Sequence, residues 1–416
     1  MMGEPGKPSP QFKPLLANTL LIFGSVLFGV GMMEIGLRIA GISYPSFYDV
    51  DGDRGHQLIP NYSAEWTHEG RGYVSINQDG LRDEDHAIPK PLNTYRIAVL
   101  GDSFSEAIKV NAEDTYWSKL EKNLAQCPAF KNRPIEVINF GVGDYGTAQE
   151  LMTLKKHVGK YQPDLVLLQI FTGNDIVNNS PALSPGDPQS GGETSRLAPF
   201  LIQKDGQWVM DTSFNQTETY RRRDSWLRRL GFTLINHSRV LQVINEAKRA
   251  FSTRQGLVAT GNPGTKNHPQ ALIPALDFDV NLYREPQNKN WQSAWEATEA
   301  LITLTHQEAK KHQAQFLAVT LSNPPQVYPD LTVRQELAKQ GAKNLFYPDQ
   351  RITKLGKKEN FAVLNLAPTF QAQADKNQTY FHGFQNTLMG IGHWNADGHQ
   401  LAGKLIADYL CQNVKP

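Results

Sequence analysis

The chain has 416 residues, enough to bury a large hydrophobic core in one domain or two. Its composition, with 40% hydrophobic, 10% aromatic and 20% charged residues, is that of a globular protein, and a net charge of +1 argues against nucleic acid or an acidic polymer as partner. Two cysteines exclude a thiolate zinc cluster and a disulfide-rich scaffold. The eleven histidines show no metal-ligand spacing and no phosphate-binding glycine loop occurs, so we expect neither a metal nor a cofactor.

The N-terminal segment is long and apolar. From Leu15 to Met33 there are nineteen residues without a charge, which at about 1.5 Å per residue nearly cross a hydrocarbon layer of roughly 30 Å. Lysines precede this segment, so the positive-inside rule favours a cytoplasmic N-terminus. We predict a cytoplasmic tail at 1–13, a single membrane anchor at 14–37 and an extracytoplasmic remainder. A cleaved signal peptide and a buried core helix are the alternatives.

The rest of the chain consists of two parts that differ in composition and in hydrophobic pattern. Residues 38–93 are rich in Gly, Pro, Asp and aromatic residues and are interpreted as a stalk and lead-in, with a short strand at 72–77. From 94 to 411, short apolar runs alternate with amphipathic segments, which predicts an α/β domain whose parallel sheet is covered by helices on both faces. The predicted strands are 95–100, 135–140, 165–171, 315–321 and 361–366, and the predicted helices are 113–124, 147–160, 291–312 and 396–410.

This alternation is interrupted at about 176–290. Pieces rich in Pro, Gly and Ser at 181–195 and 261–274 flank a helical stretch near 224–252. Arginines between 221 and 229 could contact anionic lipid or polysaccharide, although a solvated helix face is the simpler interpretation. We interpret the interruption as a cap inserted over the functional site.

Polar residues follow the first three predicted strands. Gly101-Asp102-Ser103 follows the first strand, Gly141 follows the second and Gly173-Asn174-Asp175 follows the third. His393-Trp394-Asn395 lies just before the last predicted helix. Functional groups in open α/β sheets gather at the carboxyl ends of the strands, so we expect all four motifs at one edge.

These residue types suit acyl transfer. A serine hydroxyl is a weak nucleophile at neutral pH and needs an adjacent base, and histidine is suitable because its ordinary pKa is about 6.5. We therefore predict Ser103 as the nucleophile and His393 as its base. The backbone N–H groups of Ser103 and Gly141 and the side-chain amide of Asn174 are the predicted donors to the oxyanion.

The four motifs resemble those of the SGNH hydrolase (GDSL-like) superfamily, which is named for a Ser, a Gly, an Asn and a His. The Gly-Asp-Ser block matches 101–103, the second-block glycine matches Gly141 and the C-terminal block matches His393. The Gly-x-Asn-Asp block matches 173–175 without its spacer residue. The resemblance implies a three-layer α/β/α, flavodoxin-like fold with a five-stranded parallel sheet, and a hydrolase that acts on ester bonds without a cofactor.

The resemblance covers roughly 95–175 and 290–411. The N-terminal anchor, followed by the lead-in Asn-Gln-Asp-Gly-Leu-Arg-Asp at 77–83, is similar to a bacterial membrane-anchored branch of this superfamily.

One position departs from the family pattern. The family usually places an Asp three residues before the catalytic His, where it orients the imidazole, and here that residue is Gly390. A backbone carbonyl could orient His393 in a Ser–His dyad, or a carboxylate from elsewhere, such as Asp175, could complete a triad. A site that only binds its ligand is the third interpretation.

Other polar residues near the motifs have structural interpretations. Asp102 and Asp175 are expected to brace their loops through hydrogen bonds. His399 is expected to support the site from the first turns of the last helix, and His382 and Trp394 are candidates for lining a pocket.

The two cysteines permit a further prediction. In a flavodoxin-like winding the first and last helices lie on the same face of the sheet. Cys127 follows the first helix and Cys411 ends the last, and both helices run away from the catalytic edge. We therefore predict a Cys127–Cys411 disulfide in an oxidising compartment, with two free buried thiols as the alternative.

The sequence as a whole predicts an extracytoplasmic serine esterase that acts on a small-molecule or glycan ester and is held to the membrane by its N-terminal helix. An O-acyltransferase acting on extracellular glycan would use the same residues with a different acceptor. A catalytically silent protein that binds a glycan or a partner is the alternative from another class.

Overall fold

The computed structural model describes residues 12–131, 133–184, 196–257, 276 and 278–414. The tail predicted at 1–13 and the Pro/Gly/Ser-rich pieces at 181–195 and 261–274 lie wholly or largely outside these residues. The chain divides into two compact units. One unit comprises Met1–Ser46 with Arg229–Gly261, and the other comprises Phe47–Arg228 with Asn262–Pro416.

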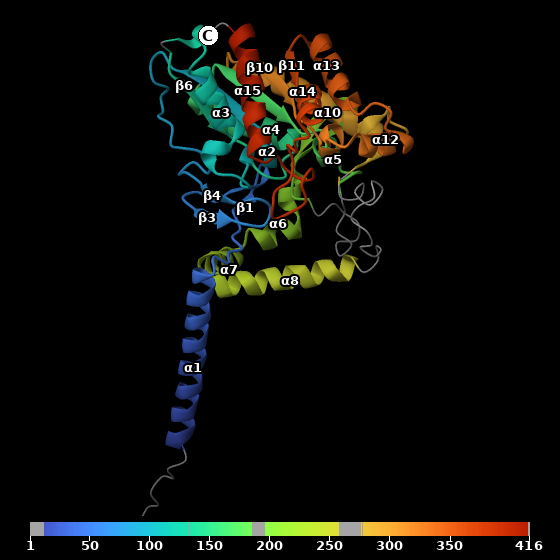
Figure 1. Cartoon of the computed structure of the whole chain (residues 1–416). Helices are drawn as coiled ribbons and strands as arrows, with labels where there is room; N and C mark the ends of the chain where they lie inside the picture. Colours follow the sequence, from blue (N-terminus) through green and yellow to red (C-terminus); the bar gives the residue numbers. More distant parts are fainter. Residues whose placement is uncertain (1–11, 132, 185–195, 258–275, 277, 415–416) are drawn as a thin grey trace, which may run out of the picture. The chain divides into compact units, whose positions relative to one another are not determined.

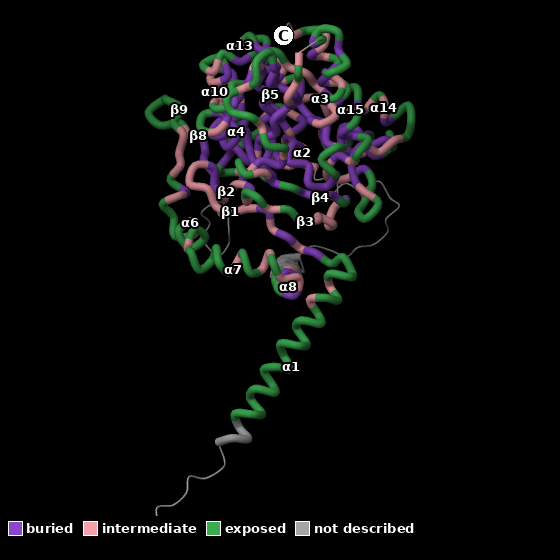
Figure 2. Tube along the Cα trace, turned by 90° about the vertical axis from the view of Figure 1, so that its left-hand side faces the viewer, coloured by how far each residue is buried: buried purple, intermediate pink, exposed green. Residues whose placement is uncertain are grey.

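The first unit is built on helix α1 (Phe12–Ile39), which is joined by α8 (Arg239–Leu257) and most of α7 (Trp226–His237). The apolar part of α1, Leu16–Ile39, has 24 residues, and at about 1.5 Å per residue it exceeds the thickness of a hydrocarbon layer. Its side chains are exposed rather than buried in the protein (Figure 2). By length and composition α1 is therefore able to span a membrane or to act as a signal sequence.

The second unit contains a five-stranded sheet in the order β11-β10-β7-β5-β6, with every neighbouring pair parallel. The strands are β5 (Tyr95–Leu100), β6 (Ile135–Asn139), β7 (Leu165–Ile170), β10 (Gln315–Thr320) and β11 (Ala362–Asn365). Numbered along the chain, this is the order 2-1-3-4-5 of a flavodoxin-like winding, as predicted. Figure 1 shows the sheet between its two layers of helices.

Alternate residues of the central strands point to opposite faces of the sheet. Ala98 and Leu100 of β5 join a core with helices on one face, while Ile97 and Val99 join a core on the other. The first core includes α10 (Lys289–Lys311) and α13 (Tyr347–Glu359), and the second includes α3 (Tyr116–Leu124), α14 (Ala367–Asn377) and α15 (Ala396–Asn413). Burial on both faces explains why these strands read as continuous apolar runs, and the three-layer α/β/α prediction is confirmed.

The second unit contains further short helices between and beside these elements. They are α2 (Ser103–Glu106), α4 (Thr147–Thr153), α5 (Asp175–Asn178), α11 (Pro324–Val327) and α12 (Leu331–Lys339).

The predicted disulfide is present. Helices α3 and α15 pack side by side, and Cys127 and Cys411 at their far ends form a disulfide with their Cα atoms 6.0 Å apart. The bond joins the beginning and the end of the sheet domain across 284 positions of sequence.

The lead-in is folded onto the sheet domain from Phe47 onward. It forms two antiparallel hairpins, β1 (Tyr48–Asp51) with β2 (Gly55–Leu58) and β3 (Ser63–Trp66) with β4 (Gly72–Ser75). Their apolar side chains share a core with Ile108, Val142 and Tyr145, which follow β5 and β6 at the carboxyl edge. The segment predicted as a stalk at 38–93 is therefore divided between the two units, and most of it belongs with the sheet.

The predicted insertion at 176–290 is also divided. A hairpin, β8 (Phe200–Lys204) with β9 (Gln207–Asp211), and α6 (Glu218–Arg223) belong to the second unit, whereas most of α7 and all of α8 belong to the first. Its interpretation as a cap over the site stays a prediction.

Candidate active site

Ser103 begins helix α2 directly after the central strand β5. The Asp102 carboxylate caps this helix by accepting a hydrogen bond from the Phe104 N–H at 2.9 Å, the bracing role expected for it. At Gly101 a Cβ atom would lie 2.2 Å from the Gln169 side chain, so the tight turn that presents Ser103 requires glycine. Ser103 Oγ lies 2.8 Å from Nε2 of His393.

His393 is held on the loop that leads into α15. Asn395 caps that helix by accepting a hydrogen bond from the Gly398 N–H at 3.1 Å, which fixes the loop immediately after the histidine. The structure thus brings together Ser103 and His393 from positions 290 residues apart.

A third residue, Glu69, contacts His393 from the turn between β3 and β4. Its Oε2 atom lies 2.7 Å from His393 Nδ1, and its Oε1 atom accepts a hydrogen bond from the His393 backbone N–H at 2.8 Å. A carboxylate on Nδ1 places the imidazole proton there, which leaves Nε2 free to accept the Ser103 proton. The site therefore has the geometry of a Ser–His–Glu triad.

Neither residue considered at the sequence level supplies this carboxylate. Gly390 has a φ of +84°, and a Cβ atom there would lie 2.5 Å from the Tyr328 ring, so the loop has no room for an acid at that position. Asp175 is buried, and burial together with the nearby Asp102 carboxylate raises its pKa well above the ordinary value. The carboxylate at Nδ1 thus comes from elsewhere in the chain, as the second interpretation allowed, but it belongs to Glu69 and not to Asp175, and it takes the place of the backbone carbonyl of the first interpretation.

Burial and neighbouring charged groups shift the pKa values of Glu69 and His393. Burial would raise the pKa of Glu69, but the hydrogen bonds and charge of His393 outweigh it and lower the pKa to about 2. Burial lowers the pKa of His393, and the buried Lys109 ammonium lowers it further against the opposing effect of Glu69. The backbone of Lys109 is tied to the Glu69 turn, because its carbonyl accepts a hydrogen bond from the Arg71 N–H at 3.0 Å. These shifts favour an ionised Glu69 beside a neutral His393 at neutral pH.

The predicted oxyanion donors have different surroundings. Asn174 Nδ2 donates to Asp102 Oδ2 at 3.0 Å, which uses one of its two N–H groups and leaves the other for a ligand. The Ser103 N–H, in the first turn of α2, has no partner within the helix.

Gly141 has another role than predicted. Its N–H donates to Asn139 Oδ1 at 3.0 Å, so it is occupied and is not available to an oxyanion. A Cβ atom there would lie 2.3 Å from Ser105 Cβ, so the glycine lets the loop after β6 approach α2. We correct the predicted oxyanion role of Gly141 accordingly.

Acidic residues are buried behind Asp102. Burial raises the pKa of Asp102 to about 6, with its hydrogen bonds opposing the rise. The pKa values of Asp175 and Glu150 are raised well above their ordinary values by burial and by neighbouring carboxylates. In the described part of the chain, the carboxyl oxygens of Asp175 and Glu150 have no hydrogen-bond partner, which fits neutral, protonated acids and contradicts the bracing role expected for Asp175.

Of the other two candidate histidines, His382 contacts the loop that carries His393, and His399 contacts the start of α3. His382 lies 2.7 Å through Nδ1 from the Gly392 carbonyl and 3.0 Å through Nε2 from Ser322 Oγ, and burial lowers its pKa to about 4. His399 Nδ1 accepts a hydrogen bond from the Tyr116 N–H at 3.2 Å. Trp394 is fully buried and donates a hydrogen bond from Nε1 to Ser322 Oγ at 2.8 Å, and its suggested place in the lining of a pocket stays a prediction.

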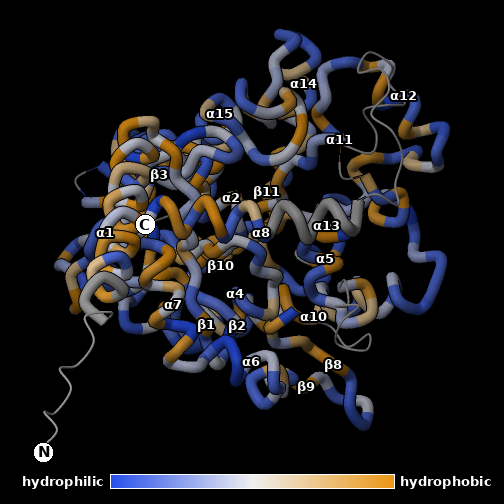
Figure 3. The backbone as a smooth tube through the Cα atoms, turned by 90° about the horizontal axis from the view of Figure 1, so that it is seen from below, coloured by the Kyte–Doolittle hydropathy of each residue, from blue (hydrophilic) through white to orange (hydrophobic). Residues whose placement is uncertain are grey.

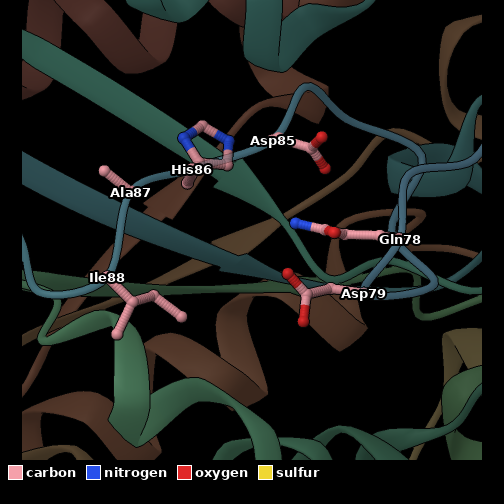
Figure 4. A pocket seen from close by; sticks show the side chains of 6 residues that line it. All are labelled: Gln78, Asp79, Asp85, His86, Ala87 and Ile88. Carbon is pink, nitrogen blue, oxygen red and sulfur yellow. The ribbon is translucent and has the colours of Figure 1, made fainter.

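A pocket of about 660 Å³ lies elsewhere on the second unit (Figure 4). It is lined by Gln78, Asp79, Asp85, His86, Ala87 and Ile88, none of which belongs to the triad. The Ala87 carbonyl accepts a hydrogen bond from Arg96 at the start of β5, which places this wall of the pocket near the amino ends of the strands.

Comparison with known proteins gives matches among solved structures alone. No family model matches the chain, and no curated protein matches it. An acetyl xylan esterase has 15% identity and a TM-score of 0.37, and covers 77% of this chain and 99% of its own. A lipase/acylhydrolase from Enterococcus faecalis has 12% identity and a TM-score of 0.36, and the match covers 78% of this chain and 98% of that protein. An M. smegmatis aryl esterase has 9% identity and a TM-score of 0.33, and the match covers 77% of this chain and 99% of that protein. The chain thus matches esterases and a lipase/acylhydrolase, at a similarity too low to transfer their activities to it.

Proposed function

We propose that the chain is a membrane-anchored serine esterase that cleaves carboxylic esters through an acyl-serine intermediate. The observation that carries the proposal is the row of hydrogen-bonded groups in which Ser103 Oγ lies 2.8 Å from His393 and His393 lies 2.7 Å from Glu69. A nucleophile, a base and a carboxylate that orients the base are the parts that covalent acyl transfer needs.

In the first half of the reaction, His393 Nε2 takes the proton of Ser103 as Oγ attacks the carbonyl carbon of the ester. The positive charge that forms on the imidazole is stabilised by the Glu69 carboxylate. The Ser103 N–H and the free N–H of the Asn174 amide donate to the oxyanion. When the tetrahedral intermediate collapses, the bond to the alcohol oxygen breaks and that oxygen takes the proton from His393.

In the second half, a water molecule gives a proton to His393 Nε2 and attacks the acyl-serine. The intermediate collapses by breaking the bond to Ser103 Oγ, which recovers its proton from His393, and the carboxylic acid is released. An alcohol in place of water would make the same site an acyltransferase.

Two features support a location outside the cytoplasm. Helix α1 is long and apolar enough to serve as an anchor. The Cys127–Cys411 disulfide suits an oxidising compartment, because cytosolic thiols are usually kept reduced.

The test is labelling of the full chain with a fluorophosphonate, which reacts with activated serines. We expect labelling of Ser103 in the wild type, none in Ser103→Ala, and unchanged labelling in Ser75→Ala, which removes an exposed hydroxyl on β4. A folded wild-type chain that is not labelled would contradict the proposal and favour a binding protein. Release of free acid with and without an added alcohol then distinguishes an esterase from an acyltransferase.

A further inference from the structure

Helices α7 and α8 present an apolar face that no described part of the chain covers. It consists of Trp226, Leu227, Leu230 and Leu234 on α7 and of Leu241 and Ile244 on α8, and we refer to these six residues as the apolar face. Trp226 is 70% exposed, Leu230 is 51% exposed and Ile244 is 58% exposed. Residues four apart lie on one side of a helix, so Trp226, Leu230 and Leu234 form a continuous stripe.

The polar sides of the two helices are held by the chain that follows α1. Asn236 of α7 exchanges two hydrogen bonds with the backbone of Ser46, at 3.1 Å and 2.8 Å. Gln242 of α8 accepts a hydrogen bond from the Tyr44 N–H at 2.9 Å. These contacts fix the rotation of both helices about their axes, so the apolar face is kept outward.

The junction of α7 and α8 is also bonded to the end of α1. The Glu34 carboxylate accepts hydrogen bonds from Ser238 Oγ and from the N–H groups of Arg239 and Val240, each at 3.0 Å, and so caps α8 from another helix. The Arg38 side chain donates to the His237 carbonyl at 2.9 Å. The start of α8 is therefore held at the level of the last turns of α1.

In Figure 1, α8 runs across the end of α1 rather than along it. If α1 crosses a bilayer, a helix in this arrangement lies near the plane of the surface, at the level of the lipid headgroups. An exposed stripe that includes a tryptophan is typical of helices at that level, because the indole ring has both apolar and polar parts. In Figure 3, which colours the backbone by hydropathy, the tube of α7 includes hydrophobic stretches.

The charge of this segment matches a lipid surface. Residues 226–248 contain four basic residues, Arg228, Arg229, Arg239 and Lys248, and one acidic residue, Glu246. Basic residues that flank an apolar stripe attract anionic headgroups.

We propose that α7 and the first turns of α8 form a second membrane contact, in which the apolar face enters the surface of the same bilayer that α1 spans and the positive net charge of residues 226–248 attracts anionic phospholipid headgroups. The proposal rests on α1 as a membrane span and is independent of the ester chemistry. Its consequence is that the first unit is fixed to the bilayer both along and across the membrane normal.

The test uses the full chain in nanodiscs made from phosphatidylcholine with phosphatidylglycerol. Because both native cysteines are in a disulfide, a single introduced cysteine can carry a spin label, whose collisions with oxygen and with a water-soluble nickel complex report its depth. We expect labels in Leu230→Cys and Ile244→Cys to collide several-fold more often with oxygen than with nickel. A label in Glu246→Cys, which lies on the side of α8 opposite Leu241 and Ile244, should show the reverse. Leu27→Cys in α1 is the positive control, and circular dichroism checks that each variant is folded.

Each remaining outcome would overturn the proposal. Frequent collisions with nickel at Leu230 and Ile244, while Leu27 is in lipid, would place the apolar face in water. Protection of these two positions from both reagents would show that a protein, such as a second copy of the chain, covers the face. A Leu27 label exposed to nickel would remove the span on which the proposal rests. Equal depth in pure phosphatidylcholine would refute the role of anionic headgroups.

Discussion

Replacing Glu69 by Gln tests the triad most directly. The carboxylate accepts two hydrogen bonds, one on each oxygen, from the backbone N–H and from Nδ1 of His393. A glutamine has one acceptor oxygen, so its NH₂ group would face one of these two donors. Either the loop contact is lost or the imidazole proton moves to Nε2, where it blocks the acceptance of the Ser103 proton.

The expected fall in kcat can be estimated from the loss of the orienting carboxylate in serine proteases and from the exposed fractions of the His393 and Glu69 side chains. Loss of the orienting carboxylate in a serine protease triad costs about 10⁴ in kcat, or about 5.4 kcal/mol of transition-state stabilisation. The side chains of His393 and Glu69 are 26% and 23% exposed, so water can replace part of the lost interaction. We therefore expect kcat of Glu69→Gln to fall by about 10³, which corresponds to about 4 kcal/mol.

The assay is hydrolysis of p-nitrophenyl acetate by the full chain as a function of pH. Glu69 raises the pKa of His393, so its loss should lower that pKa and move the acid limb of the profile to lower pH even as the maximum falls. A merely misfolded variant would lose activity without moving the limb. Glu65→Gln is the matched control, because Glu65 lies on the same hairpin and pairs with Arg71 at 2.6 Å, and its kcat should not change. Wild-type kcat and an unmoved acid limb in Glu69→Gln would refute the triad and favour a dyad.

Three further predictions concern the charge of Lys109, the oxyanion donor Asn174 and the Cys127–Cys411 disulfide. In Lys109→Met the loss of the buried ammonium should raise the pKa of His393 and move the acid limb of the kcat/KM profile to higher pH. In Lys109→Arg the charge is kept, so the acid limb should stay in place. Equal pH profiles for both variants would exclude an effect of the Lys109 charge on His393. In Asn174→Ala kcat should fall by about 10² to 10³ with little change in KM, and a rise in KM alone would exclude an oxyanion donor. In the double variant Cys127→Ser, Cys411→Ser the free energy of unfolding should fall by about 4 kcal/mol, and an unchanged denaturant midpoint would contradict this.

The sheet was predictable because its strands are buried on both faces. Runs such as Tyr95–Leu100 and Leu165–Ile170 leave few alternatives to a central parallel strand, and the observed bounds agree with the predicted ones within a residue. In the lead-in the strand predicted at 72–77 is confirmed as β4, but β1, β2 and β3 were missed because each has four residues, too few to establish a period of two against Gly-rich and Pro-rich surroundings.

Part of the site was predictable for a similar reason. Ser103, Asn174 and His393 lie beside strand ends and a helix start that the sequence marks clearly, so their convergence followed from the sheet topology. Glu69 lies 324 positions from His393 in a turn without a motif, and its contact depends on how the lead-in folds over the sheet. The role of Gly141 was misjudged because its N–H donates a local hydrogen bond to Asn139 Oδ1, and sequence spacing does not reveal such a bond.

The position of Glu69 limits how far the chain can be shortened from its N-terminus. A fragment that starts at Tyr95 would retain the serine, asparagine and histidine motifs and the complete sheet, and by its motifs it would look whole. It would nevertheless lack the acid, which the turn carries with the help of Asn386, whose side chain bonds the backbone of Gly70 at 3.0 Å in both directions. If the proposed triad is correct, the minimal catalytic unit of this chain begins before its first recognisable motif, and shortened versions intended for crystallisation or screening should keep the hairpins.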